Sequence, residues 1–117
     1  MRLIKRTRFS NKERSLKSER ELAKLVNGRV QPASGAIDRA DLKADVKSRF
    51  HLIDDKVTGK GSYSIARKLW RVLGKQAWQN RLKPALRINF EGDFKVYVIS
   101  EQDFLVLQEA LEAGIQR

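Results

Sequence analysis

Three residues near the middle of the chain, Asp45, Asp54 and Lys56, are of types that could act together on a phosphate ester. Two neighbouring carboxylates repel each other, and a hard cation such as Mg²⁺, which prefers oxygen ligands, would remove that repulsion. Such an ion polarises a phosphodiester and lowers the pKa of an attacking water. A lysine ammonium can orient that water or stabilise the developing negative charge. The same spacing also occurs in ordinary charge clusters on edge strands, so a scaffold must bring the three residues together.

The sequence around these residues predicts a β-hairpin. Residues 43–47 and 50–57 are expected to form two strands joined by a tight turn at Ser48 and Arg49, although the usual Asn-Gly signature is absent. Successive side chains of a strand alternate between the two faces of a sheet. In this register all three residues share one face, and the two aspartates are diagonal cross-strand neighbours within reach of a shared ion.

The rest of the chain predicts an α/β fold, in which a mixed five-stranded sheet is flanked by helices in the order α-β-β-β-α-β-β-α. Residues 1–11 are expected to form a flexible basic arm, and residues 12–117 a single domain. The other expected elements are a helix over 12–26, a strand over 29–32, loops over 33–36 and 58–62, a helix over 64–82, strands over 85–90 and 94–99, and a helix over 101–114.

Composition points to a polyanionic partner. The chain has 25 Lys and Arg against 14 Asp and Glu, a net charge of +11, and nucleic acid is the simplest partner for such a charge. Residues 91–117 carry six acids and two bases, so this segment is expected to face away from it. The absence of cysteine excludes disulfides and thiolate chemistry. Without an apolar run of about 20 residues, a cytoplasmic protein with no membrane partner is expected.

Four short motifs in this order resemble the core of the PD-(D/E)xK nucleases, and more narrowly the Holliday-junction-resolvase-like group found in archaea and phages. They are SERELAKLV, PASGA, ADV and DDK, within a resemblance that spans roughly residues 17–104. The resemblance implies a restriction-endonuclease-like core. It also implies a homodimer that uses Mg²⁺, with Mn²⁺ as a substitute, to cut four-way DNA junctions in the cytoplasm, or in the host cytoplasm for a phage protein.

The resemblance also assigns roles within the site. It makes Asp45 the main metal ligand, Asp54 the second carboxylate and Lys56 the catalytic lysine, and the backbone carbonyl of Asp55 a further ligand. The family normally has an apolar residue between the second acid and the lysine, because that position faces the core. Here it is an aspartate, which requires either an open core or a basic partner such as Lys47 or His51.

A glutamate on the first helix is also implied by the resemblance, and Glu19 and Glu21 compete for that role. They point about 160° apart on a helix, at about 100° per residue. Glu19 is favoured, because it lies beside the apolar face of the helix and matches the first acid of the family's run. Glu21 remains the alternative.

Basic residues around the site are expected to grip the DNA backbone rather than to identify bases. The expected DNA contacts, which include a loop serine suggested by the resemblance, are Arg6, Arg8, Lys12, Ser34, Arg39, Lys43, Lys47 and Lys60. The Gly-rich loop at Gly59–Ser62 lacks the rest of a P-loop, so no nucleotide cofactor is expected.

Two alternative functions remain. The protein could be a less selective nickase or repair endonuclease, or a catalytically silent DNA-binding module of the same fold. The dimer contact could come from the tryptophan-bearing helix or from the C-terminal segment.

Overall fold

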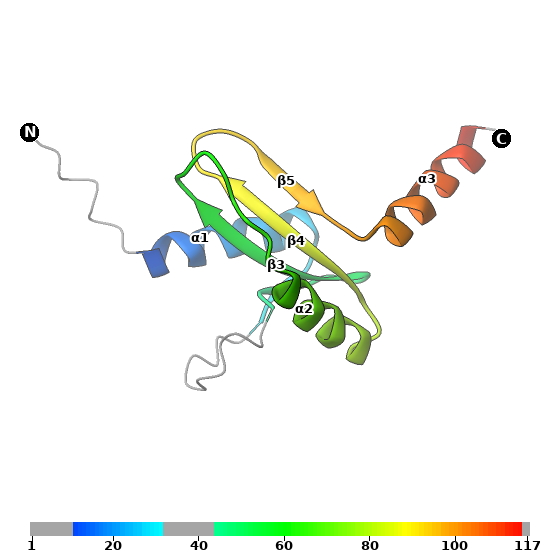
Figure 1. The fold of residues 1–117 in the computed structure, drawn as a ribbon, viewed down its shortest axis with the longest axis horizontal. Coiled ribbons are helices and arrows are strands. Elements are labelled where there is room, and N and C mark those ends of the chain that lie inside the picture. The colour runs from blue at the N-terminus through cyan, green and yellow to red at the C-terminus, as the bar shows by residue number, and fades with distance from the viewer. Residues whose placement is uncertain (1–10, 32–43, 116–117) are drawn as a thin grey trace, which may run out of the picture.

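The protein is described by a computed structural model that covers residues 11–31 and 44–115. In this part of the chain it confirms an α/β fold with a mixed five-stranded sheet and three helices (Figure 1). None of the described helices is both long and apolar enough to cross a membrane. The elements are α1 (Asn11–Leu25), β1 (Arg29–Val30), β2 (Val46–Lys47), β3 (His51–Thr58), α2 (Arg67–Gln79), β4 (Lys83–Phe90), β5 (Lys95–Val98) and α3 (Glu101–Ile115).

The strands lie across the sheet in chain order, β1-β2-β3-β4-β5. The first three pair antiparallel, β4 pairs parallel to β3 over eight residues, and β5 returns antiparallel to β4. A parallel pair needs a crossover connection, and α2 with its flanking loops supplies it. The expected arm at 1–11 lies outside the described residues except for Asn11, which begins α1. The loop expected at 33–36 also lies outside them.

The hairpin that was expected to turn at Ser48 and Arg49 turns one residue later. Val46 pairs with Ile53, and the Ser48 N–H donates to the His51 carbonyl at 2.9 Å, so the turn residues are Arg49 and Phe50. The Ser48 hydroxyl accepts the His51 N–H at 3.1 Å and fixes this register, which the absence of a turn signature had left open. The expected register, and the diagonal placement of the two aspartates that it implied, are therefore wrong, because Ile53 pairs with Val46, the residue after Asp45.

Each face of the sheet carries one helix and one apolar cluster. On one face, Leu22 of α1 packs against Val46, Ile53 and Ala85, with the partly buried Val26, Val30 and Ile99 around them. On the other face, Leu73 and Ala77 of α2 pack against Leu52 and Ala44. Figure 1 shows β3 and β4 between these two helices. Because α1 and α2 both pack on β3, residues of this strand can be supported from both sides.

Backbone conformation shortens α2 relative to the expected 64–82. Ala66 is extended (φ −78°, ψ 139°), and Arg81 takes a left-handed conformation (φ 58°) that ends the helix before Pro84. At the end of α1, Asn27 is also left-handed (φ 55°), and Gly28 follows. A Cβ at Gly28 would lie 2.6 Å from the Lys47 carbonyl oxygen, so only glycine lets the chain pass this close to β2.

Candidate active site

Asp45 and Asp54 meet beside β3, at the point where β2 begins. The Asp45 N–H donates to the Ile53 carbonyl at 3.0 Å, and the Asp45 carboxyl shares a hydrogen bond with that of Asp54. The Asp45 carboxylate then accepts the backbone N–H of Asp55 at 2.7 Å. Asp45 is therefore attached to β3 through both its backbone and its side chain, although it lies just outside β2.

Lys56 lies two residues beyond Asp54 on β3 and points the same way, as alternation requires. Its Nζ is 3.5 Å from Asp54 Oδ2. The Asp54 side chain is 9% exposed and the lysine side chain 36%, so the pair forms a partly open edge of a buried site. Burial alone would lower the pKa of Lys56, but the charges of Asp54, Tyr63 and Asp45 outweigh it and raise that pKa.

Glu19 enters the same cluster from α1. Burial raises the pKa of Glu19, while a hydrogen bond shared with Asp45 acts against the rise. The charges of Asp55 and Asp54 raise that pKa further, and the charge of Lys56 lowers it. The structure thus brings Glu19 together with the three residues of the hairpin.

Asp45 has the most perturbed carboxyl of the cluster. Burial and the adjacent Asp54 raise the pKa of Asp45 to about 9, the charge of Glu19 adds to the rise, and the Asp55 N–H opposes it. A carboxyl in such surroundings keeps its proton at neutral pH unless another positive charge replaces it. The cluster therefore has an excess of carboxyl groups over the positive charge that the protein itself supplies.

This excess is what a divalent cation would balance. The donor set consists of carboxylate oxygens, with the Asp55 carbonyl in addition, and oxygen ligands suit Mg²⁺ and Mn²⁺. Among residues 11–31 and 44–115, no three Asp, Glu or His side chains already stand in a metal-holding arrangement. Asp45 instead shares hydrogen bonds with Glu19 and Asp54, so these carboxyls would have to exchange protons for a cation.

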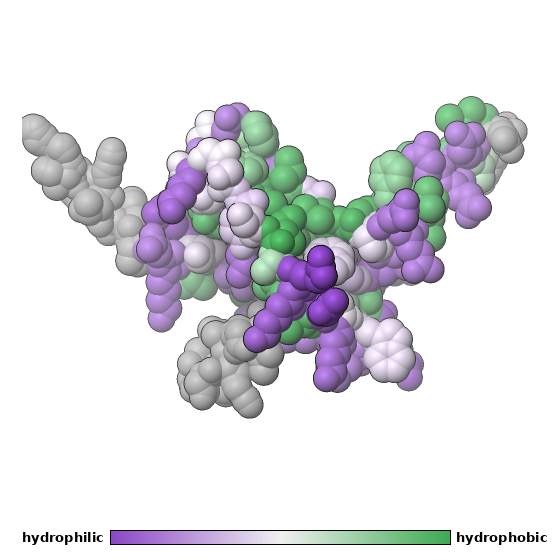
Figure 2. Space-filling view, in the orientation of Figure 1, coloured by the Kyte–Doolittle hydropathy of each residue, from purple (hydrophilic) through white to green (hydrophobic). Residues whose placement is uncertain are grey.

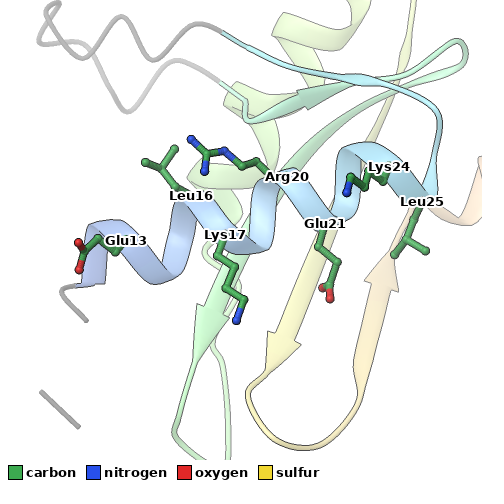
Figure 3. Close-up of a pocket in the computed structure, with 7 residues that line it drawn as sticks. All are labelled: Glu13, Leu16, Lys17, Arg20, Glu21, Lys24 and Leu25. Carbon is green, nitrogen blue, oxygen red and sulfur yellow. The ribbon is translucent and has the colours of Figure 1, made fainter. Parts of the chain in front are cut away.

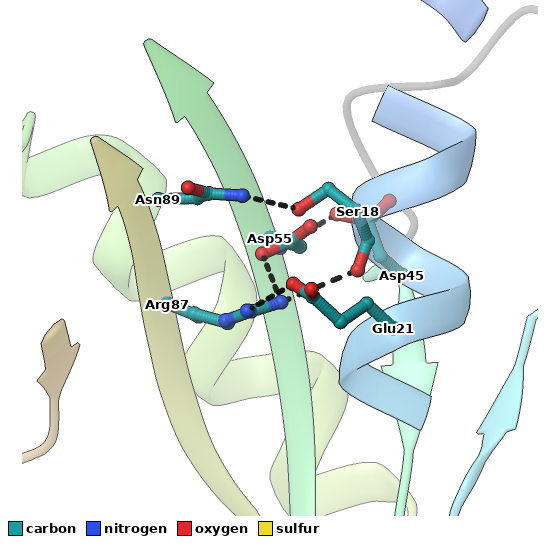
Figure 4. A network of polar contacts seen from close by, with 6 residues as sticks. All are labelled: Ser18, Glu21, Asp45, Asp55, Arg87 and Asn89. Atoms are coloured by element: carbon teal, nitrogen blue, oxygen red, sulfur yellow. Dashed lines mark hydrogen bonds and ion pairs between the residues drawn. The ribbon is translucent and has the colours of Figure 1, made fainter. Parts of the chain in front are cut away.

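Behind the cluster, on the α1 face of the sheet, a polar network surrounds Arg87 of β4 (Figure 4). The guanidinium is fully buried; Nη1 donates to the Ser18 carbonyl at 3.2 Å and lies 3.5 Å from Asp55 Oδ1. Nη2 donates to Glu21 Oε1 at 2.9 Å. Asn89 completes the network through its Nδ2, which donates to Ser18 Oγ at 3.0 Å. The network links α1, β3 and β4 directly behind Asp54.

Arg87 explains the aspartate at the position where the nuclease family has an apolar residue. Burial raises the pKa of Asp55, and the Ser18 hydroxyl and Arg87 lower it. The expectation that Lys47 or His51 is the partner of Asp55 is wrong, because Lys47 donates to Asn80 Oδ1 at 3.2 Å instead. The partner could have been suspected from the sequence, since an arginine stands among apolar residues in the predicted strand 85–90.

The two glutamates that competed for the site lie in different surroundings. Glu21 takes part in the Arg87 network, and its hydrogen bond to Arg87 lowers the pKa of its carboxyl. Glu19, two residues earlier, lies among the hairpin carboxyls. The carboxylate of Glu21 is hydrogen-bonded to Arg87, whereas Glu19 lies beside Asp45 and Asp54. Glu19 is therefore the glutamate that can serve as the fourth residue of the site.

Only part of the expected DNA-contact set falls within the described residues. Lys12 and Lys60 are exposed, on α1 and in the loop after β3, and Lys47 is half-buried beside Asn80. The remaining expected contacts lie outside the described residues; they are Arg6, Arg8, Ser34, Arg39 and Lys43.

The outer face of α1 adds basic residues that were not among the expected contacts. A pocket of about 580 Å³ lies along it (Figure 3). Three cations in its lining recur every three or four residues and therefore share one side of the helix. The lining consists of Glu13, Leu16, Lys17, Arg20, Glu21, Lys24 and Leu25. Glu19 is not in this lining, so the pocket is separate from the carboxyl cluster.

Comparisons with protein-family models, with curated proteins and with solved structures found no match for this chain.

Proposed function

We propose that the protein is a metal-dependent DNA endonuclease that resolves four-way junctions. The observation that supports this proposal best is the convergence of Glu19, Asp45 and Asp54 with Lys56 beside the beginning of β2. Three acids from α1, from β3 and from the residue before β2 are costly to bury together, and burial with Asp54 raises the pKa of Asp45. A cation-binding and catalytic role explains that cost better than a charge cluster that stabilises the fold.

The side chains divide the chemical tasks between them. Asp45, Asp54, Glu19 and the Asp55 carbonyl would hold the cation, which would supply charge to polarise the phosphodiester and to acidify water. Lys56 stays charged, since the surrounding acids raise its pKa, and its partly exposed ammonium can contact a phosphate oxygen or the attacking water. The Arg87 network keeps α1 against β3 and so keeps Glu19 opposite Asp45.

Charge supports DNA as the substrate. The chain has a net charge of +11, and cations lie on the outer face of α1 and in the loop after β3. Such cations bind phosphates and discriminate poorly between sequences, which suits an enzyme that recognises DNA shape. Selectivity for a four-way junction over other DNA comes from the family resemblance alone and is the finer part of the proposal.

The proposal is tested by incubating the protein with a labelled four-way junction and with a linear duplex of the same sequence, in Mg²⁺ or in EDTA. Symmetric Mg²⁺-dependent cuts in the junction alone are expected. Equal cutting of both substrates would replace the resolvase with a less selective nickase. Binding without metal-dependent cutting would overturn the enzyme and leave a silent DNA-binding module.

Two matched variants assign any cleavage to the site. Asp45→Asn should abolish cutting and preserve junction binding, because it removes a carboxylate from the cluster and no cation from the surface. Asp93→Asn makes the same chemical change in the exposed turn after β4 and should cut normally. Normal cutting by Asp45→Asn would show that the site lies elsewhere.

A further inference from the structure

Helix α3 projects from the body of the protein (Figure 1), and its large apolar side chains are exposed. Asp103 is the only buried residue of this helix, and no other described element packs extensively against it. Phe104, Leu107 and Leu111 are 54%, 51% and 65% exposed. A 15-residue helix is marginal alone in water and gains its stability from packing, so this one needs a partner surface.

The uncovered residues form a stripe. Phe104, Leu107, Leu111 and Ile115 recur at three- and four-residue spacing, which places them on one side of the helix. Leu105 is also exposed but lies off that side, at about 100° per residue. A continuous apolar stripe on an exposed helix is typical of a protein–protein contact.

The body of the same chain does not cover the stripe, because the first turn of α3 is fixed in direction. The Asp103 N–H donates to Ser100 Oγ at 3.1 Å, and the Asp103 carboxylate pairs with Lys83 Nζ at 3.2 Å. Two residues join β5 to the helix. The helix is therefore anchored at the beginning of β4 and projects away from the sheet.

A matching surface lies on the α2 face of the sheet, over β5. Arg87 faces α1, so the neighbouring Ile88 and its cross-strand partner Val96 face the α2 side. Helix α2 packs on β3 and β4, which leaves β5 without a helix on this side. Val96 is 38% exposed and Phe94, which contacts the Phe90 ring, is 56% exposed. Figure 2 shows apolar surface running from the sheet toward α3.

Charge identifies the occupant of this surface. Helix α2 contains four bases and no acid, whereas α3 contains four acids and no base. Two α3 helices packed against each other would bring like charges together, but α3 beside α2 of another molecule brings opposite charges together. The bases are Arg67, Lys68, Arg71 and Lys75; the acids are Glu101, Asp103, Glu109 and Glu112.

We propose that α3 of one molecule covers β5 of a second copy of this chain, beside the second copy's α2, in a symmetric dimer. The exchange is reciprocal, so each molecule gives one helix and receives one, as two-fold symmetry requires. The dimer would supply the second active site needed for paired cleavage, and in that respect the inference rests on the proposed function. Its test, however, requires no DNA.

The test is the mass in solution, measured by sedimentation equilibrium over a range of concentrations. A dimer is expected for the unchanged chain. Leu107→Glu with Leu111→Glu should give a monomer with the same far-UV circular dichroism, because both positions are exposed in the single molecule. Leu105→Glu makes the same change off the stripe and should leave the dimer intact. A monomeric unchanged chain, or equal disruption by the Leu105 variant, would overturn the inference.

Charge reversal distinguishes this dimer from one made by two α3 helices. Glu109→Lys with Glu112→Lys should weaken the dimer at least about tenfold, and Arg71→Glu with Lys75→Glu should do the same. All four changes in one chain should restore it. If reversing the charges on α3 tightens the dimer, or if reversing those on α2 has no effect, the contact does not involve α2.

The outcomes also separate this inference from the proposed function. A monomer that cuts junctions would refute only this inference, and a dimer that never cuts would refute only the proposed function.

Discussion

At the scale of single residues, the pKa of Asp45 gives the candidate site its chemical character. The carboxyl is paired with other carboxyls rather than with a cation, and burial with Asp54 raises its pKa to about 9. A proton therefore takes the place that a metal ion would take in the working site. Proton and metal ion should compete for the same oxygens, as they do at other carboxylate sites.

This competition predicts how stability depends on pH without metal. The pKa of Asp45 is higher in the folded protein than its ordinary value of 3.8, so the folded state binds the proton more tightly than the unfolded state. The stabilising contribution is complete below about pH 4 and is lost as the pH rises toward about 9. Thermal melts in EDTA should therefore show a melting temperature that falls across this range, and Asp45→Asn should reduce the fall.

Mg²⁺ should reverse that loss. Added at pH 8.5, it should raise the melting temperature of the unchanged protein, since a ligand that binds only the folded state stabilises it. The rise should be smaller at pH 5, where protons compete, and should disappear in Asp45→Asn. An equal rise in Asp45→Asn and in Asp93→Asn would mean that Mg²⁺ binds elsewhere.

The two glutamates of α1 should separate catalysis from stability. Glu19→Gln should lower junction cleavage by at least about 100-fold with little change in the melting temperature. Glu21→Gln should lower the melting temperature, since it weakens a hydrogen bond to the buried Arg87, and should leave cleavage within a few-fold of normal. Cleavage assays and melts on the same preparations would show whether the roles are instead reversed.

Sequence alone predicted the residues of this cluster better than their contacts. Asp54 and Lys56 lie two residues apart on the same strand. Alternation therefore places both on one face, whichever residues of the neighbouring strand they pair with. Arg87 was unusual enough among apolar residues to suggest a buried partner, but its pairing with Asp55 depends on which strand lies beside β3 and in what register. That pairing is parallel and distant in the chain, and no local pattern specifies it.

At the scale of elements, the Arg87 network attaches α1 and β4 to the back of β3. Arg87→Met would leave the buried Asp55 carboxyl without its cation, and we expect a loss of about 3–5 kcal/mol in the free energy of unfolding. Combining it with Asp55→Val should recover most of the loss, because an apolar pair replaces a buried ion pair at little cost. Urea denaturation measures the free energy of unfolding of both variants. If the double variant is no more stable than Arg87→Met, then Ser18 and Glu21, rather than Asp55, make Arg87 necessary.

Gly28 determines how closely α1 and β1 approach β2. Gly28→Ala would place a Cβ against the Lys47 backbone, and we expect a loss of about 1–3 kcal/mol as the strands separate. The shift would also move Asp45, which directly precedes β2. Gly61→Ala is the matched control, since a Cβ there would meet no atom within 4 Å. Equal denaturation midpoints for the two variants would contradict this account of the close approach.

The hairpin turn shows where sequence patterns stop being sufficient. The residues at 48–51 contain no Asn-Gly or Asp-Gly pair, so adjacent registers were hard to distinguish. The Ser48 side chain selects the register by accepting the His51 N–H, and Arg49 lies 5.0 Å over the Phe50 ring. Side-chain contacts of this kind decide between registers that periodicity treats alike.

At the scale of the whole molecule, charge divides the chain between two kinds of partner. The first ninety residues carry all of the positive excess, since residues 91–117 have more acids than bases, and the charged residues of α3 are all acids. The body therefore suits a polyanion, and α3 suits a basic protein surface. The three helices and the mixed sheet could be predicted from periodicity, but the projecting course of α3 could not, because it depends on the contact of Asp103 with Lys83.

Junction binding should weaken steeply with salt. Each phosphate neutralised by a lysine or arginine releases counterions, so the logarithm of the binding constant should fall linearly with the logarithm of salt concentration. Lys17→Gln with Lys24→Gln on the outer face of α1 should reduce that slope by about 2 if both contact phosphates. Fluorescence anisotropy in EDTA measures the slope without cleavage, and an unchanged slope would exclude this face of α1 from the DNA contact.

The parallel pairing of β3 with β4 also has a consequence for how the chain folds. The contact of Asp45 with Asp55 spans ten residues, whereas Arg87 reaches Asp55 across 32 residues and a whole helix. Short loops close first, so the hairpin brings its acids together before the compensating arginine arrives. The early hairpin is thus opposed by its own charge, and mild acid or Mg²⁺ should accelerate refolding in stopped-flow experiments. In this chain, the carboxyl groups proposed to bind Mg²⁺ would also limit the rate at which the domain folds.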